Sequence, residues 1–342
     1  MQFNKPSHQK NHSLAAAKRS CFPLLGALTL PRLFIRIMRN FYKIHLLTTL
    51  VFGMLSFKTL AHDQPAAYEV INLADDFYSV YQSSKKLSPE KRAERFSQYF
   101  TSQFEPFYSN KNFVKSIENF SEIEEVYLLK NNRLSKNLND SMESFIATIA
   151  DFKSETPIYI LHSLGRFNGA TRDLNGKSYL MFGVDLMAKY HNWKNDTPFF
   201  HHELFHVYHE NFFQCNDELW CSLWTEGLAT HVSHQLNSSA TNDELMLNIP
   251  ENMIKNVRSR LLYSLTDLKR KFYSKNPETY SSFFNFRKDE TNLPYRRGYY
   301  LGYILAKEIG KNYSIEELAK MEKKTVELLL LKELDSFIES EG

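Results

Sequence analysis

Residues 199–210 read F-F-H-H-E-L-F-H-V-Y-H-E, and His202, Glu203 and His206 within them form an H-E-x-x-H sequence. On a helix, residues four positions apart lie on one face, so the two histidines can bind a single metal ion. Glu203 lies beside His202 and can accept a proton from a water on that ion. The same five-residue pattern also arises by chance on histidine-rich helices, so its meaning depends on the rest of the chain.

Three features predict that this stretch is helical. Asp196 or Thr197 can cap the first turn, and Pro198 suits the first helical position. Apolar residues recur at helical spacing, at Phe200, Leu204, Phe205 and Val207. The sequence therefore predicts a helix that presents both histidines on one face.

A catalytic zinc site needs three protein ligands and an open position for water. Residues 224–230 read W-T-E-G-L-A-T, with Glu226 twenty residues after His206. That gap fits a helix end, a loop and a returning helix packed alongside, and Gly227 would allow close contact between helices. Glu226 is therefore the predicted third ligand of a His2Glu site.

Other side chains compete for this role, namely His201, His209, Glu210, His231 and His234. The first two lie off the face that the H-E-x-x-H histidines share, and the last two lie one and two turns beyond Glu226. A metzincin would need a third histidine six residues after His206, where Phe212 stands. The metzincin interpretation is therefore excluded.

H-E-L-F-H followed by E-G-L-A resembles the gluzincin type of zinc metallopeptidase. More narrowly, the chain resembles a bacterial family of zinc-dependent proteases that adds a later G-Y-Y-x-G, here residues 298–302. The likeness covers about residues 157–320. It implies one Zn²⁺ held by His202, His206 and Glu226, with Glu203 as the general base. No G-x-M-E-N precedes the zinc helix, so the chain departs from the gluzincin aminopeptidases.

The expected chemistry also needs a hydrogen-bond donor for the oxyanion. Tyr299 or Tyr300, in R-R-G-Y-Y-L-G-Y, is the candidate, and adjacent helical residues point about 100° apart, so only one is expected to serve. The alternative is that both are core tyrosines. Asp217 or Glu218 is a candidate to orient a ligand histidine.

The fold class predicted from these patterns is α+β and predominantly helical, with a small sheet just before the H-E-x-x-H helix. Residues 62–155 are expected to form a helical N-terminal region and residues 156–342 a zincin-like catalytic domain.

Helices are predicted at about 66–82, 88–104, 123–153, 186–193, 218–236, 253–273, 295–309 and 326–338, with a capping box at 314–317. Strands are predicted at 157–164 and 177–184, and loops at 165–171 and 277–294, with a hairpin turn at Asn175-Gly176. The edge of such a sheet can pair with an extended peptide.

The positive formal charge of the chain comes from its first 61 residues. The 342 residues carry a formal charge of +3, but residues 1–61 hold nine Lys or Arg and no Asp or Glu. The remainder has 33 basic against 39 acidic residues, a balance of −6, which gives no reason to expect a nucleic-acid partner. From Met38 the sequence has the basic start, apolar run and small-residue end of a secretory signal peptide, with cleavage after Ala61.

Two interpretations of this leader remain. Residues 1–37 are an over-long gene start ahead of a signal peptide at 38–61, or they are a genuine basic extension with an uncleaved anchor. The apolar run is short for a membrane span. Export would leave Cys215 and Cys221 as an even pair in an oxidising compartment, which favours a disulfide. Zinc ligation by this pair is the alternative, although no second pair stands at finger spacing.

The sequence therefore predicts an exported, periplasmic or secreted zinc peptidase that acts on peptides or proteins and keeps no stable membrane span after signal cleavage. The alternatives are a catalytically inactive envelope binding protein with the same fold, and a structural protein whose motif is accidental. The intact Glu203 argues against the first alternative, because a purely structural zinc site needs no general base.

Overall fold

The computed structural model describes residues 68–191 and 195–342, which all belong to the unit Gln64–Gly342. Fourteen α-helices and one four-stranded sheet make up its regular structure, apart from a single 3₁₀ turn. The predicted class, α+β and predominantly helical with a small sheet before the H-E-x-x-H helix, is confirmed. The predicted extension at 1–37 and signal peptide at 38–61 lie outside the described residues. None of the helices in the described part has the length and apolar character that a membrane crossing requires.

The first part of the unit is helical but begins with a strand. Its elements are β1 (Val70–Asn72), α2 (Ala74–Ser83), α3 (Pro89–Gln103), α4 (Glu105–Tyr108), α5 (Val114–Asn119), η1 (Phe120–Glu122) and α6 (Glu124–Thr148). The single helix expected over 66–82 is wrong at its start. The β-branched pair Val70-Ile71 favours a strand, and the Asn72 side chain accepts a hydrogen bond from the Ala74 amide at 2.9 Å, so the helix begins there.

The sheet contains β1, β2 (Ile158–Leu161), β3 (Gly169–Leu174) and β4 (Lys177–Gly183), in the order β1-β2-β4-β3. β1 pairs in parallel with β2 from Val70 opposite Ile158, so the N-terminal region contributes directly to the sheet. β2 and β4 are parallel, and β3 and β4 are antiparallel. The predicted hairpin turn at Asn175-Gly176 joins β3 to β4, with φ of 53° and 76°. The loop expected over 165–171 is wrong at its end, because β3 already begins at Gly169.

The second part contains the remaining helices. They are α7 (Val184–Tyr190), α8 (Thr197–His209), α9 (Leu219–Leu236), α10 (Met253–Arg258), α11 (Leu261–Lys271), α12 (Pro277–Phe284), α13 (Arg297–Ile309), α14 (Ile315–Ala319) and α15 (Lys323–Glu341). The helix expected over 253–273 breaks at Arg260, which leaves the helical region with φ of −137°. The loop expected over 277–294 contains α12, which Asn276 caps and Pro277 starts. The capping box of Ser314 and Glu317 is confirmed.

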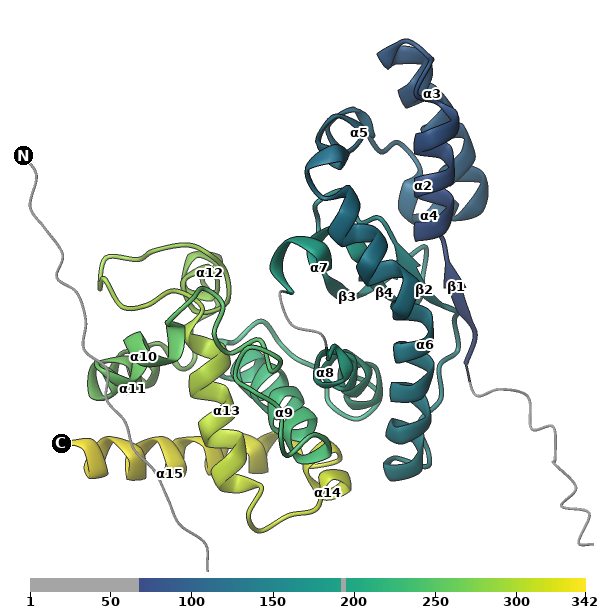
Figure 1. Ribbon diagram of the computed structural model, residues 1–342. Helices are drawn as coiled ribbons and strands as arrows, with labels where there is room; N and C mark the ends of the chain where they lie inside the picture. Colours follow the sequence, from purple (N-terminus) through teal and green to yellow (C-terminus); the bar gives the residue numbers. More distant parts are fainter. Residues whose placement is uncertain (1–67, 192–194) are drawn as a thin grey trace, which may run out of the picture. The chain divides into compact units, whose positions relative to one another are not determined.

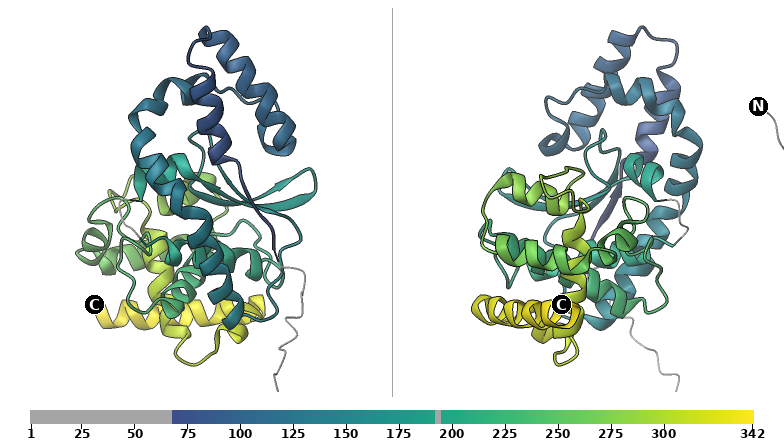
Figure 2. Two further views of the ribbon diagram at one scale, coloured as in Figure 1. Left: turned by 45° about the vertical axis from the view of Figure 1, so that its right-hand side comes forward. Right: turned by 90° about the vertical axis from the view of Figure 1, so that its left-hand side faces the viewer.

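Figures 1 and 2 show α2–α5 at one end of this unit and α9–α15 at the other, with the sheet and α8 between them. α8 contacts β3 and β4 on one side and α9 on the other. α13 packs along α9, and α15 crosses α9, α11 and α13. The H-E-x-x-H helix therefore lies between the sheet and the helix that carries Glu226.

The contact between α9 and α13 depends on two glycines. A Cβ on Gly227 would lie 2.3 Å from the carbonyl carbon of Gly302, and a Cβ on Gly302 would lie 2.4 Å from the carbonyl oxygen of Leu223. Both neighbours are backbone atoms that cannot move aside. Gly227 thus allows the close contact between helices that the sequence predicted, with α13 as the neighbouring helix, and Gly302 is its counterpart on α13.

Gly302→Ala is therefore expected to destabilise the protein by about 1–3 kcal/mol, because the added methyl group must push two helices apart. The measurement is urea unfolding monitored by circular dichroism. Gly342→Ala, at the exposed C-terminus, is the matched control and should leave the free energy of unfolding within about 0.5 kcal/mol of the parent. Equal stability of the two variants would contradict this account of the contact.

Candidate metal centre

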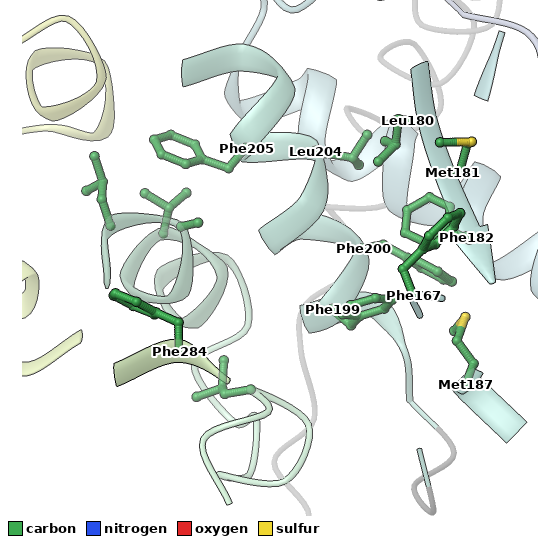
Figure 3. Close-up of a cluster of buried hydrophobic side chains, with 14 of the residues drawn as sticks. Phe167, Leu180, Met181, Phe182, Met187, Phe199, Phe200, Leu204, Phe205 and Phe284 are labelled. Atoms are coloured by element: carbon green, nitrogen blue, oxygen red, sulfur yellow. The ribbon is translucent and has the colours of Figure 1, made fainter. Parts of the chain in front are cut away.

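The apolar side chains of α8 pack against the sheet, and the polar face of the helix lines the cleft. Phe199 and Phe200 pack edge-on against Phe182 of β4, with ring centroids 5.8 and 5.0 Å apart. Figure 3 shows these rings with Leu204 on the side of α8 that faces β4. His202, Glu203 and His206 are only partly buried and line the cleft.

The three predicted metal ligands converge on one point. Nε2 of His202 and Nε2 of His206 lie 3.0 Å apart. Oε2 of Glu226, which reaches across from α9, lies 3.3 Å from the first and 3.4 Å from the second. Within the described part of the chain this is the only trio of His, Cys, Asp or Glu arranged to hold a metal ion.

The donor set and its spacing fit zinc. A tetrahedral ion with bonds of about 2.0–2.1 Å keeps neighbouring donors about 3.3–3.4 Å apart. Two imidazole nitrogens and one carboxylate oxygen are also a set found in catalytic zinc sites. The three side chains could therefore bind zinc and leave a fourth position for water or substrate.

The charges of the trio favour a cation as well. Burial opposes the charged form of His206, but the neighbouring Glu226 carboxylate outweighs it and raises the pKa of His206 to about 9, so a metal ion would take the place of a proton on this histidine. Burial likewise opposes ionisation of Glu226, yet the two histidines hold its pKa far below the usual range. Glu226 is therefore a carboxylate at neutral pH, as a metal ligand must be.

Thr230 orients one of the ligands. Its hydroxyl donates to the carbonyl of Glu226 at 2.9 Å and lies 3.4 Å from Nδ1 of His202. The hydroxyl oxygen can thus accept a hydrogen bond from Nδ1–H of His202, which leaves the electron pair of Nε2 free for a metal ion. The sequence had suggested Asp217 or Glu218 for this role. Glu218 instead accepts hydrogen bonds from Trp220 and Asn216 in the α8–α9 connection.

The competing histidines are engaged elsewhere. His201 lies between Asn237 and the pair Ser141 and Ser144. His234 is 2.6 Å from the hydroxyl of Tyr303. His209 stacks between Phe205 and Phe213, and the His231 ring packs against Gly310.

Glu203 lies against the sheet. A Cβ on Gly169, the first residue of β3, would lie 2.7 Å from the Glu203 carboxyl carbon and 2.6 Å from the Phe199 ring. Only a glycine lets the strand come this close to the carboxylate. Burial, with the charge of Glu226 adding to it, raises the pKa of Glu203 in spite of the nearby histidines. That shift makes Glu203 a better proton acceptor than an exposed glutamate.

The two candidate tyrosines occupy different places. Tyr299 lines the cleft, and its hydroxyl makes no hydrogen bond with a described residue. Burial, with the charge of Glu226 adding to it, raises its pKa well above the usual value, so it remains a hydrogen-bond donor. Tyr300 is buried on another face of α13, where its hydroxyl accepts a bond from Nε of Arg258 at 2.7 Å. Tyr280 of α12, which the sequence did not suggest, also lines the cleft.

The cleft that contains these groups has a volume of about 1030 Å³. Gly169, Ala170 and Thr171 of β3 form one wall of it. β3 is the last strand of the sheet and pairs with β4 alone, so its outer edge has no partner strand in the described structure. A free strand edge therefore runs beside Glu203.

A contact near each end of α8 fixes the helix in place. The sequence predicted the one that follows the helix but not the one that precedes it. Asp196 does not cap the helix with its side chain but accepts from Nζ of Lys130, on α6, at 2.9 Å. At the other end, a disulfide links Cys215, in the connection that follows α8, to Cys221 in the first turn of α9, as predicted. The two ligand-bearing helices are thus tied to each other and to the N-terminal region.

Comparison of the chain with family models, curated proteins and solved structures gives no match. The three motifs and the geometry described above are therefore the basis for any statement about function.

Proposed function

We propose that this protein is an exported zinc-dependent peptidase. The observation that carries the proposal is the convergence of His202, His206 and Glu226 beside a partly buried Glu203, in a cleft with a free strand edge. A site that only held zinc would need neither the carboxylate nor the edge. Export rests on the sequence of residues 38–61, and the disulfide is consistent with an oxidising compartment.

Each residue has a distinct role in this proposal. Zinc held by the three ligands supplies the Lewis acidity that polarises a carbonyl and lowers the pKa of a water towards about 7. Glu203 accepts the proton of the attacking water and passes it to the leaving amine. The Tyr299 hydroxyl donates to the oxyanion that develops on the carbonyl. The free edge of β3 pairs with the extended backbone of the substrate and lays it beside Glu203.

Zinc quantitation combined with a peptide-library digest tests the proposal. Protein purified after export should contain about one zinc per chain and cleave peptides, and EDTA should abolish cleavage until zinc is restored. His202→Ala, His206→Ala and Glu226→Ala should each lose the metal. A protein that retained zinc after Glu226→Ala, but lost it after His231→Ala or His234→Ala, would refute the ligand assignment.

Replacing Tyr299 and replacing Tyr300 should affect different properties, the turnover rate in one case and the stability in the other. Tyr299→Phe is expected to lower kcat by about 10²–10³-fold with little change in stability, because it removes one donor to the oxyanion. Tyr300→Phe should keep kcat but lower the free energy of unfolding by about 0.5–1.5 kcal/mol, because it removes the hydroxyl that accepts a hydrogen bond from the exposed Arg258 side chain. Steady-state kinetics and urea unfolding of both variants are the measurements. A loss of kcat in Tyr300→Phe alone would reverse the assignment.

A further inference from the structure

Arg296, which precedes α13, is a buried cation in the wall of the same cleft. Its side chain is 9% exposed, and its guanidinium lies 4.4 Å from the centre of the Tyr299 ring. Nε donates to the carbonyl of Ile249 at 2.9 Å, and Nη1 donates to that of Phe284 at 3.3 Å. The backbone at Arg296 is left-handed, with φ of 60°. The chain therefore holds this guanidinium in one place.

No carboxylate in the described structure pairs with Arg296. Its neighbour Arg297 shows the contrast, since Nη2 of Arg297 lies 2.8 Å from both Asp267 and Asp289. Burying a charge is costly unless an opposite charge or a full set of hydrogen bonds compensates for it. Two backbone carbonyls satisfy part of the Arg296 guanidinium, and its Nη2 makes no hydrogen bond with a described residue. The rings of Phe286 and Tyr299 lie 5.1 and 4.4 Å from the guanidinium and add cation–π contacts, which leaves Nη2 as the position where an anion could bind.

An anion bound by Arg296 would lie in the same cleft as the candidate metal ligands. Tyr299 is affected by the charges of both Glu226 and Arg296, and so is Tyr280. Arg296 and Tyr299 line the same cleft as the metal ligands, and the guanidinium lies against the Tyr299 ring. The other arginine in the cleft wall, Arg166, is exposed, and five carboxylates line the same cleft: Asp173, Glu203, Glu210, Glu226 and Glu244. Of the two arginines that line this acidic cleft, Arg296 is therefore the buried one that could bind an anion.

We propose that Arg296 binds a carboxylate of the substrate, so that the enzyme prefers peptides with a carboxylate close to the scissile bond. The planar guanidinium suits a carboxylate, which can accept two of its N–H groups at once. The carboxylate is either the free C-terminus of the peptide or the side chain of Asp or Glu. This inference rests on the proposed peptidase function and adds its substrate class.

Matched peptides provide the kinetic test. N-acetylated hexapeptides are prepared as free acids and as C-terminal amides, and each is made with Glu or Gln at the positions flanking the cleavage site. The zinc-loaded parent should cleave the form with the carboxylate at least tenfold more efficiently, as judged by kcat/KM, because a charge-assisted bidentate contact is lost in the other form. The acid–amide pair identifies a C-terminal carboxylate, and the Glu–Gln pair identifies a side chain.

Arg296→Gln should bring the ratio of kcat/KM between the carboxylate and neutral forms of a peptide close to one, and Arg296→Lys should keep part of the preference. Arg166→Gln is the control and should preserve the preference. Equal kcat/KM for all matched peptides in the parent protein overturns the proposal even if Arg296→Gln does not fold. A preference that survives in a folded Arg296→Gln protein also overturns it and leaves Arg296 as a clamp for the segment before α13.

A binding experiment separates this proposal from the peptidase function. N-acetyl-Phe-Leu and its amide, and N-acetyl-Glu-amide and N-acetyl-Gln-amide, are titrated into the zinc-loaded Glu203→Gln protein by calorimetry. Tighter binding of a carboxylate form, lost in Glu203→Gln/Arg296→Gln, supports the carboxylate site even if the parent cleaves no peptide. Cleavage of peptides without any carboxylate preference, in kinetics or in binding, sustains the peptidase function and refutes the role of Arg296.

Discussion

Glu203→Gln is expected to lower peptide turnover by about 10²–10⁴-fold and to leave the zinc content unchanged. Glutamine keeps the size and much of the hydrogen bonding of glutamate, but it cannot accept a proton at neutral pH. Glu203 is not one of the converging ligands, so metal binding should not depend on its charge. The measurements are kcat with a cleaved library peptide and zinc content by mass spectrometry.

Glu218→Gln is the matched control for this substitution. Glu218 lies in the connection between α8 and α9, where it accepts hydrogen bonds from Trp220 and Asn216. Its replacement should leave turnover within about threefold of the parent, since surface substitutions away from the site change free energies by about 0.5 kcal/mol or less. If Glu203→Gln cleaved peptides as fast as Glu218→Gln, proton transfer by Glu203 would have to be abandoned.

The parts of the site that the sequence predicted lie on continuous helices. The periodicity of α8 and α9 and the fixed H-E-x-x-H spacing place His202, His206 and Glu226 without any knowledge of the sheet. The close contact at Gly227 was also predicted from the sequence, whereas its neighbour, Gly302 of α13, is known only from the structure. The local sequence pattern is enough to predict the role of a residue wherever that role depends only on the helix face on which the residue lies.

The elements that the sequence missed depend on partners far along the chain. β1 is only three residues long and is a strand because β2, almost 90 positions later, pairs with it. The role of Gly169 beside Glu203 requires β3 to lie against α8, which no local spacing shows. Thr230 and Arg296 take their roles from contacts between elements as well. α12 alone had a readable signal, an asparagine cap followed by proline.

The ion pair between Lys130 and Asp196 is a contact of this kind. Lys130 lies in the second turn of α6, Asp196 directly precedes α8, and both side chains are almost fully buried. Asp196 also lies 3.3 Å from Nδ1 of His191, whose other ring nitrogen accepts a bond from Asn168 at 3.0 Å. One carboxylate therefore connects the N-terminal region, the start of α8 and the residue before β3.

Lys130→Met is expected to lower the free energy of unfolding by about 3–5 kcal/mol, because it leaves the Asp196 carboxylate buried without its cation. Burial opposes ionisation of Asp196, but His191 and Lys130 outweigh it and lower its pKa in the folded state. The stabilisation is thus present at neutral pH and is lost as the pH falls through that lowered pKa. Urea unfolding of the zinc-loaded protein at pH 7 is the measurement.

Two further variants show whether the buried charge is the cause. Arg133 lies 3.9 Å from the same carboxylate and is about one-third exposed, so Arg133→Met should cost no more than about 1 kcal/mol. Burial lowers the pKa of Lys130 despite the attraction of Asp196, which indicates that desolvation offsets much of the gain from pairing. Lys130→Met/Asp196→Asn should therefore recover most of the stability that the single substitution loses. If the double variant were as unstable as Lys130→Met, lost packing of the lysine chain, and not an unpaired carboxylate, would explain the effect.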